Sequence, residues 1–158
     1  MNRLIIAMTL LLPAFTLTAR AQQKVPDNQN MINMESNTIR LTIKGGKTFT
    51  ATLENNASAQ ALKDRLSKGS ITVEMNDYGD MEKVGPLGFS LPRTDRQTTT
   101  RPGDIILYLG NNLVIYYDTN SWNFTRIGRV NGINTRGEML DLLGGVGKRT
   151  VTISSEEE

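Results

Sequence analysis

Short segments in which apolar and polar residues alternate run through most of the sequence after residue 38. Apolar residues occupy every second position over 39–43 and again over 49–53, and Gly45 and Gly46 lie between the two runs. A period of two places such residues on one face of a β-strand. Because glycines separate two runs of this kind, the segment predicts a β-hairpin at the start of the folded domain.

Further strands are predicted along the rest of the chain. Residues 71–75 alternate as a third strand, and dense apolar runs at 104–109 and 113–117 flank a tight turn at 110–112. These two runs are predicted to be well-buried strands at the centre of the core. Residues 121–130 alternate again, with Trp122 and Phe124 expected to point inward and Ile127 as a further inward candidate, and residues 151–153 suggest a last strand.

Two short helices complete the predicted fold. Asn56 or Ser58 can cap the first, whose apolar residues lie three and four apart up to Leu66. Thr135 with Glu138 makes a capping-box pattern for the second, which Gly144 and Gly145 end after Leu143. Several short strands with two short helices predict a mainly β fold, a closed or nearly closed β-barrel with helices at its ends.

Residues 76–103 contain many glycines and prolines, and we predict a long loop region there, with room for one short strand at 88–91. The region also keeps apolar residues such as Val84, Leu87, Phe89 and Leu91. Long connections in compact domains are usually functional or disordered, and the apolar content speaks against disorder. We therefore expect the surface formed by this region to bind a ligand.

The first 21 residues have the parts of a secretory signal: Arg3, an apolar run over 4–17 and small residues at Ala19 and Ala21. The run is shorter than the ~20 residues of a spanning helix, and Pro13 interrupts it. Cleavage is expected after Ala21, followed by a flexible leader at 22–37, one domain at 38–154 and an acidic tail at 155–158. The protein is then exported, periplasmic or secreted, without a membrane span after signal cleavage.

Composition excludes several kinds of chemistry. The chain has no cysteine and no histidine, so disulfides, thiolate sites, serine–histidine triads and the commonest metal ligand are absent. Arg3 and Arg20 lie in the signal, which leaves 16 of the 18 basic residues against 16 acidic ones in the mature chain. A net charge of zero gives no support for nucleic-acid binding, and neither a metal nor a cofactor is predicted.

Five spaced blocks of sequence carry a resemblance to a known family. They read IKGGKTFTATL at 43–53, SAQAL at 58–62, MNDYGDMEKVGPLGFSLP at 75–92, PGDIILY at 102–108 and SWNFTRIGRV at 121–130. Together they resemble the bacterial cyclophilin-like proteins. The resemblance implies a small β-barrel shaped like the cyclophilins, which are peptidyl-prolyl isomerases, but it does not imply their activity. The phenylalanine–histidine–arginine run of those enzymes has no counterpart in a chain without histidine, so no catalytic residue is carried over.

Aromatic and arginine side chains are the candidates for a site: Tyr78, Met81, Phe89, Arg93, Arg96, Trp122 and Arg126. An isomerase would need an apolar pocket and a guanidinium that donates in the twisted transition state. Alternatively, Arg93, Arg96 and Arg101 could bind an anionic ligand, or an exposed sheet edge could pair with an extended peptide. The sequence favours a domain that binds a small ligand or peptide, with an isomerase as the alternative and the oligomeric state open.

Overall fold

The structure is a computed structural model, and it describes residues 36–156. These residues form nine strands and two helices. In chain order they are β1 Thr38–Ile43, β2 Thr48–Leu53, α1 Ala57–Leu66, β3 Ile71–Tyr78, β4 Glu82–Pro86, β5 Arg96–Thr99, β6 Asp104–Tyr108, β7 Asn112–Tyr116, β8 Ser121–Val130, α2 Arg136–Leu143 and β9 Arg149–Ser155. The signal peptide and nearly all of the leader predicted from the sequence lie outside the described residues.

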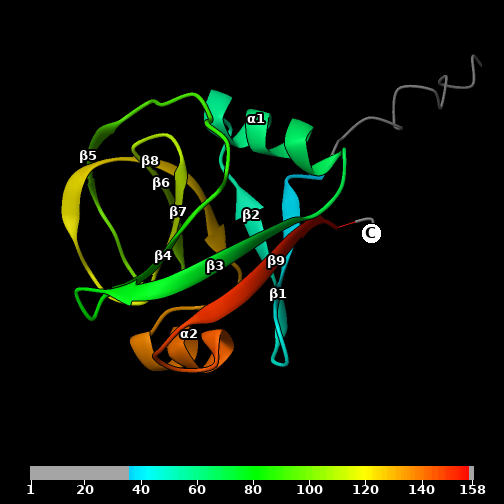
Figure 1. Cartoon of the computed structure of the whole chain (residues 1–158). Helices are drawn as coiled ribbons and strands as arrows, with labels where there is room; N and C mark the ends of the chain where they lie inside the picture. The colour runs from blue at the N-terminus through cyan, green and yellow to red at the C-terminus, as the bar shows by residue number, and fades with distance from the viewer. Residues whose placement is uncertain (1–35, 157–158) are drawn as a thin grey trace, which may run out of the picture. The chain divides into compact units, whose positions relative to one another are not determined.

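Eight of the strands close into an antiparallel barrel (Figure 1). Neighbouring strands follow the order β2-β1-β9-β3-β4-β7-β6-β8, and β8 pairs with β2 to complete the ring. The ninth strand, β5, pairs only with residues 121–124 of β8. The predicted mainly β, closed barrel with two short helices is confirmed, and β1 and β2 form the predicted hairpin, whose turn contains Gly45 and Gly46.

The helices lie at opposite ends of the barrel (Figure 1). Asn56 caps α1 by accepting a hydrogen bond from the Ala59 amide, and Thr135 and Glu138 form the predicted capping box of α2. Apolar residues of both helices join those of the barrel interior in one core. Its members include Leu41, Ile43, Leu62, Leu66, Met75, Ile105, Leu107, Leu113, Ile115, Ile127, Met139, Leu143 and Val151.

The prediction of a long loop over 76–103 is wrong. Strand β3 continues to Tyr78, strands β4 and β5 interrupt the remainder and leave a shorter connection at 87–95, and no strand forms at 88–91. Gly85, one of the glycines that led to the loop prediction, lies inside β4, where an added Cβ would overlap the carbonyl oxygen of Glu74 on β3. This glycine permits a close approach between two backbones, which has the same sequence signature as a turn.

The predicted inward orientation of Trp122 and Phe124 is also wrong. Trp122 is 62% exposed, and Phe124 belongs to a separate cluster outside the barrel, whereas Ile127 is in the interior. The register between β6 and β8 shifts by one residue, because Ile105 pairs with Gly128 and Ile106 with Arg126. Because of this bulge, the inward-facing side chains of β8 change from odd-numbered to even-numbered residues along the strand.

Candidate functional site

Strands β6 and β7 are buried on both faces. One face of each lies in the barrel interior, and the other contributes Ile106, Val114 and Tyr116 to a second cluster on the outer wall, together with Phe124 of β8. Met81 and Val84 pack against this cluster. Both helices lie at the ends of the barrel, so neither helix covers this part of the wall (Figure 1).

A groove of about 350 Å³ opens over this second cluster. Three of its residues form one row across the outer wall, because Tyr78 on β3 pairs with Glu82 on β4, and Glu82 pairs with Tyr116 on β7. The part of β8 that pairs with β5 supplies the facing side. We call this the aromatic groove, and it is lined by Tyr78, Glu82, Val84, Tyr108, Val114, Tyr116, Asn120, Trp122 and Phe124.

The aromatic rings differ in how much they pack. Phe124 contacts Tyr116 with ring centroids 5.8 Å apart and Tyr108 edge-on at 6.4 Å. Tyr116 is fully buried, but Trp122 and Tyr78 are 62% and 67% exposed. Large aromatic rings exposed beside an apolar concavity are typical of binding surfaces.

One ionisable carboxyl lines the groove. Glu82 is only 8% exposed, and burial raises its pKa above the ordinary value, although the Tyr116 hydroxyl acts in the opposite direction. Burial and the nearby Glu82 also raise the pKa of Tyr116, whose hydroxyl oxygen accepts a hydrogen bond from Asn120 Nδ2 at 3.2 Å. The groove is therefore apolar and aromatic, with polar atoms gathered around Glu82, Tyr116 and Asn120.

The candidate residues predicted from the sequence do not share one site. Tyr78 and Trp122 line the aromatic groove, and Met81 packs against the cluster beneath it. Phe89 instead packs against the interior core, with the Arg65 guanidinium 5.4 Å from its ring centroid. Of the predicted aromatic residues, Tyr78 and Trp122 thus lie in one groove and Phe89 does not.

The arginines lie in two other hollows. Arg93 lines one beside Tyr108 and Trp122, and its guanidinium donates to the Asp95 carboxylate through Nε at 3.0 Å and through Nη2. Arg96 and Arg126 line another, of about 230 Å³. In that hollow Arg126 Nη2 donates to the buried carboxylate of Asp104 at 2.9 Å. Of the three arginines predicted for an anionic ligand, Arg93 and Arg96 lie in different hollows, and Arg101 lines neither of them nor the aromatic groove. Arg93 already pairs with Asp95, so the described residues do not bring these three guanidinium groups into one anion site.

Sequence reasoning missed most of the groove: Glu82, Val84, Tyr108, Val114, Tyr116, Asn120 and Phe124. A signal for part of it was present. The dense apolar runs at 104–109 and 113–117 have too many apolar residues for strands with one solvent-exposed face. This excess indicates that both faces are buried, but it does not show what covers the second face.

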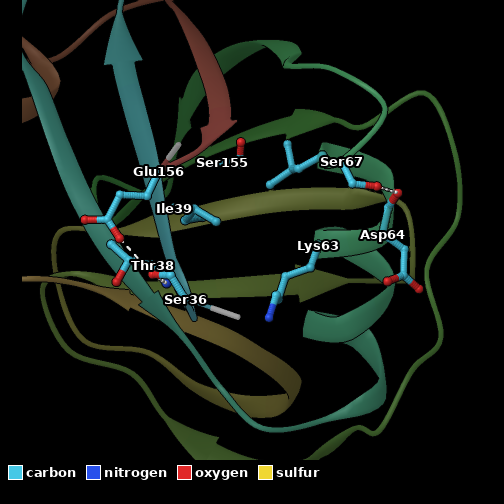
Figure 2. A pocket seen from close by; sticks show the side chains of 9 residues that line it. Ser36, Thr38, Ile39, Lys63, Asp64, Ser67, Ser155 and Glu156 are labelled. Carbon is cyan, nitrogen blue, oxygen red and sulfur yellow. Dashed lines mark hydrogen bonds between the residues drawn. The ribbon is translucent and has the colours of Figure 1, made fainter. Parts of the chain in front are cut away.

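A further hollow, of about 380 Å³, lies between β1 and the end of α1 (Figure 2). Most of the residues that line it have polar side chains, including Lys63 and Asp64 of α1. Ser36 Oγ donates to Glu156 Oε2 at 2.7 Å across one side. None of the candidate residues lines it, and the rings that make the aromatic groove suited to an apolar ligand are absent from its wall.

Among residues 36–156, no helix is long and apolar enough to cross a membrane. Within the same range, no group of three or more acidic side chains is placed to hold a metal ion.

Comparison with known proteins agrees with the fold. A closed antiparallel barrel with a helix at each end defines the class, and residues 41–154 match the Cyclophilin-like family, so the chain belongs to that family. The solution structure of the hypothetical protein AF2241 from Archaeoglobus fulgidus is similar, with a TM-score of 0.51 at 13% identity over 77% of this chain and 95% of that one. At this identity the likeness concerns the fold alone. No curated protein matches the sequence.

Proposed function

We propose that the protein is a binding module that takes a small ligand or a peptide segment into the aromatic groove. The observation that carries the proposal is the pair of exposed rings, Trp122 and Tyr78, beside a concave apolar surface on the barrel wall. Ligand sites are concave and mostly apolar with a few polar groups, in the range of ~300–1,000 Å³. The groove, at about 350 Å³, has the size of a small ligand or of one or two peptide side chains.

The chemistry of the groove favours binding over catalysis. An isomerase of the kind considered above needs a guanidinium next to the apolar pocket, and among residues 36–156 no arginine lines the groove. Arg93 lies in the adjoining hollow and is paired with Asp95. Of the described residues in the lining, Glu82 alone carries a carboxyl group, whereas glycoside hydrolysis commonly uses two.

The experiment uses the protein's own reporter. Trp122 is the only tryptophan in the chain, so its fluorescence reports on the groove directly. A library of small molecules and short peptides would be screened by tryptophan fluorescence and by thermal shift, since a ligand that binds the folded state raises Tm. Ligands that shift both signals are expected.

Variants then locate the site. Tyr78→Ala should weaken binding at least tenfold without loss of fold, because the side chain is largely exposed. Val146→Ala is the matched control, since Val146 is an exposed apolar residue after α2 that lines none of these hollows. Ligands that bind Tyr78→Ala as tightly as the wild type, or NMR shifts confined to the hollow of Figure 2, would contradict the proposal.

We also propose that the protein acts outside the cytoplasm. Support comes from the charged start, the apolar run and the small residues before Gln22. Intact-mass analysis of the protein from a secreting bacterial host should give a chain that begins at Gln22. A cytoplasmic product that keeps residues 1–21 would refute export.

A further inference from the structure

Glu82 differs from the other buried acids of the barrel in having no basic partner. Asp104, 1% exposed, pairs with both Arg126 and Arg129, at 2.9 and 2.8 Å. The half-buried Asp77 pairs with Lys83. Within residues 36–156 no ion pair involves Glu82, although only 8% of it is exposed.

A carboxylate in this position is costly, because burial removes water from the charge without supplying a counter-charge. The raised pKa of Glu82 is the expected consequence of that burial. A cation that entered the groove would supply the missing partner and make the ionised carboxylate favourable.

The walls of the groove suit the same ligand. Aromatic rings carry a negative face that attracts ammonium and guanidinium groups, and the attraction grows when water is excluded. Five rings line the groove, on both sides of Glu82. The protein already uses this contact elsewhere, since the Arg136 guanidinium lies 5.0 Å from the centroid of the Tyr117 ring.

We propose that the aromatic groove binds a cationic organic group, an ammonium or a guanidinium, with Glu82 as the counter-ion and the rings of Tyr78 and Trp122 as its walls. This inference rests on the proposed function and names the chemistry of the ligand. The cation is either a small organic ammonium compound or the side chain of a lysine or arginine in a peptide. An anion is disfavoured, because the one charge that the groove can carry is negative.

The test compares ligands of one shape and different charge. Choline and its neutral isostere 3,3-dimethyl-1-butanol would be titrated into the full chain and followed by Trp122 fluorescence and NMR shifts. Choline should bind at least ~tenfold more tightly. Glu82→Gln should lower choline affinity to about that of the alcohol and leave the affinity for the alcohol unchanged.

Two peptide arms separate the sources of the cation. A blocked tripeptide with a central lysine is compared with the same peptide carrying norleucine, which has a similar chain without charge. Tighter binding of the lysine peptide than of choline assigns the groove to a peptide side chain. The reverse order assigns it to a small organic ammonium compound.

The pH dependence gives a second readout. Choline affinity should rise with pH in the wild type, as Glu82 loses its proton, and should stay level in Glu82→Gln. The other titratable groups that line the groove are Tyr78 of β3, Tyr108 of β6 and Tyr116 of β7, and burial raises the pKa of Tyr116. If Glu82→Gln does not fold, Trp122→Leu replaces it, and binding is followed by NMR shifts alone because this variant has no tryptophan. Choline affinity should then fall by a larger factor than that of the alcohol.

The outcomes separate the proposed function from the preference for a cation. If choline and the alcohol bind with equal affinity, as followed by the signals of Trp122, the cation inference is overturned and the groove remains a site for neutral ligands. Binding of other compounds from the library, with none of the four cation and control probes perturbing Trp122, would do the same. If no compound of any charge perturbs Trp122, both the inference and the proposed function fall.

Discussion

Replacing Asp77 by asparagine should destabilise the barrel strongly, because it removes the counter-charge of a lysine that is completely buried. Lys83 Nζ donates to Asp77 Oδ1 at 2.6 Å and to the Gly147 carbonyl oxygen at 2.7 Å. The Asp77 carboxylate also accepts from the Tyr117 hydroxyl and the Gly147 amide. Asparagine keeps the size and one acceptor oxygen, so the change is mainly one of charge.

The size of the effect follows from burial. The side chain of Lys83 is 0% exposed and that of Asp77 is 22% exposed. In the variant the buried ammonium would keep only neutral acceptors, the asparagine oxygen and the Gly147 carbonyl oxygen, without a counter-charge or access to water. Breaking one partner of a buried ion pair costs about 3–5 kcal/mol in free energy of unfolding. With a urea m-value of about 2 kcal/mol/M, the unfolding midpoint should fall by roughly 2 M.

Urea unfolding followed by circular dichroism measures the effect. The double variant Asp77→Asn with Lys83→Met is the control, since it removes the buried charge together with its partner. It should be more stable than Asp77→Asn alone. A loss below about 1 kcal/mol for Asp77→Asn would refute the reasoning, as would a double variant whose loss equals the sum of the two single losses.

The same pair predicts a dependence on pH. Burial by itself raises the pKa of Asp77, but hydrogen bonds from Lys83 and from the Gly147 amide outweigh it and hold the pKa below the ordinary value of 3.8. A carboxyl with a lowered pKa in the folded state stabilises the protein above its unfolded pKa and loses that contribution as pH falls through the folded value. The stability difference between wild type and Asp77→Asn should be constant above about pH 5 and shrink below about pH 4. Urea titrations of both proteins at each pH measure this difference.

Three further substitutions test how the fold is built. Thr135→Ala removes the cap of α2 and should cost about 1 kcal/mol in urea unfolding; no loss would mean that the capping box does not hold the helix. Gly85→Ala should lower stability by more than about 3 kcal/mol, because its Cβ would overlap the backbone of β3, and a normal unfolding curve would contradict that close approach. Gly137→Ala, in open space within α2, should raise Tm, with a gain of about 0.5–1 kcal/mol; a lower Tm would show a constraint at Gly137 that the structure does not reveal.

Local patterns identified the elements that depend on neighbours in sequence. The cap and capping box of the helices, the first hairpin and the bounds of β8 are all determined by residues a few positions apart. Gly85 shows where that reasoning fails. The same residue type marks a turn and a close contact between strands, and only the neighbouring strand β3 distinguishes the two.

The prediction that Trp122 points into the core failed for a related reason. Alternation fixes which residues share a face but not which face is inside, and the register shift opposite Ile127 exchanges the two faces along β8. Trp122 was therefore expected in the core and is instead the exposed wall of a groove.

Short strands and two capped helices around one apolar core can be predicted from the sequence of this chain, because period, capping residues and turn glycines act over a few residues. The groove depends instead on how distant segments pair in the folded barrel. The pairing of β4 with β7 brings Glu82 next to Tyr116, far along the chain, and the separate β5–β8 pairing brings Trp122 to face them. Pairing between strands that are not consecutive depends on how the whole barrel closes, and no local period encodes it.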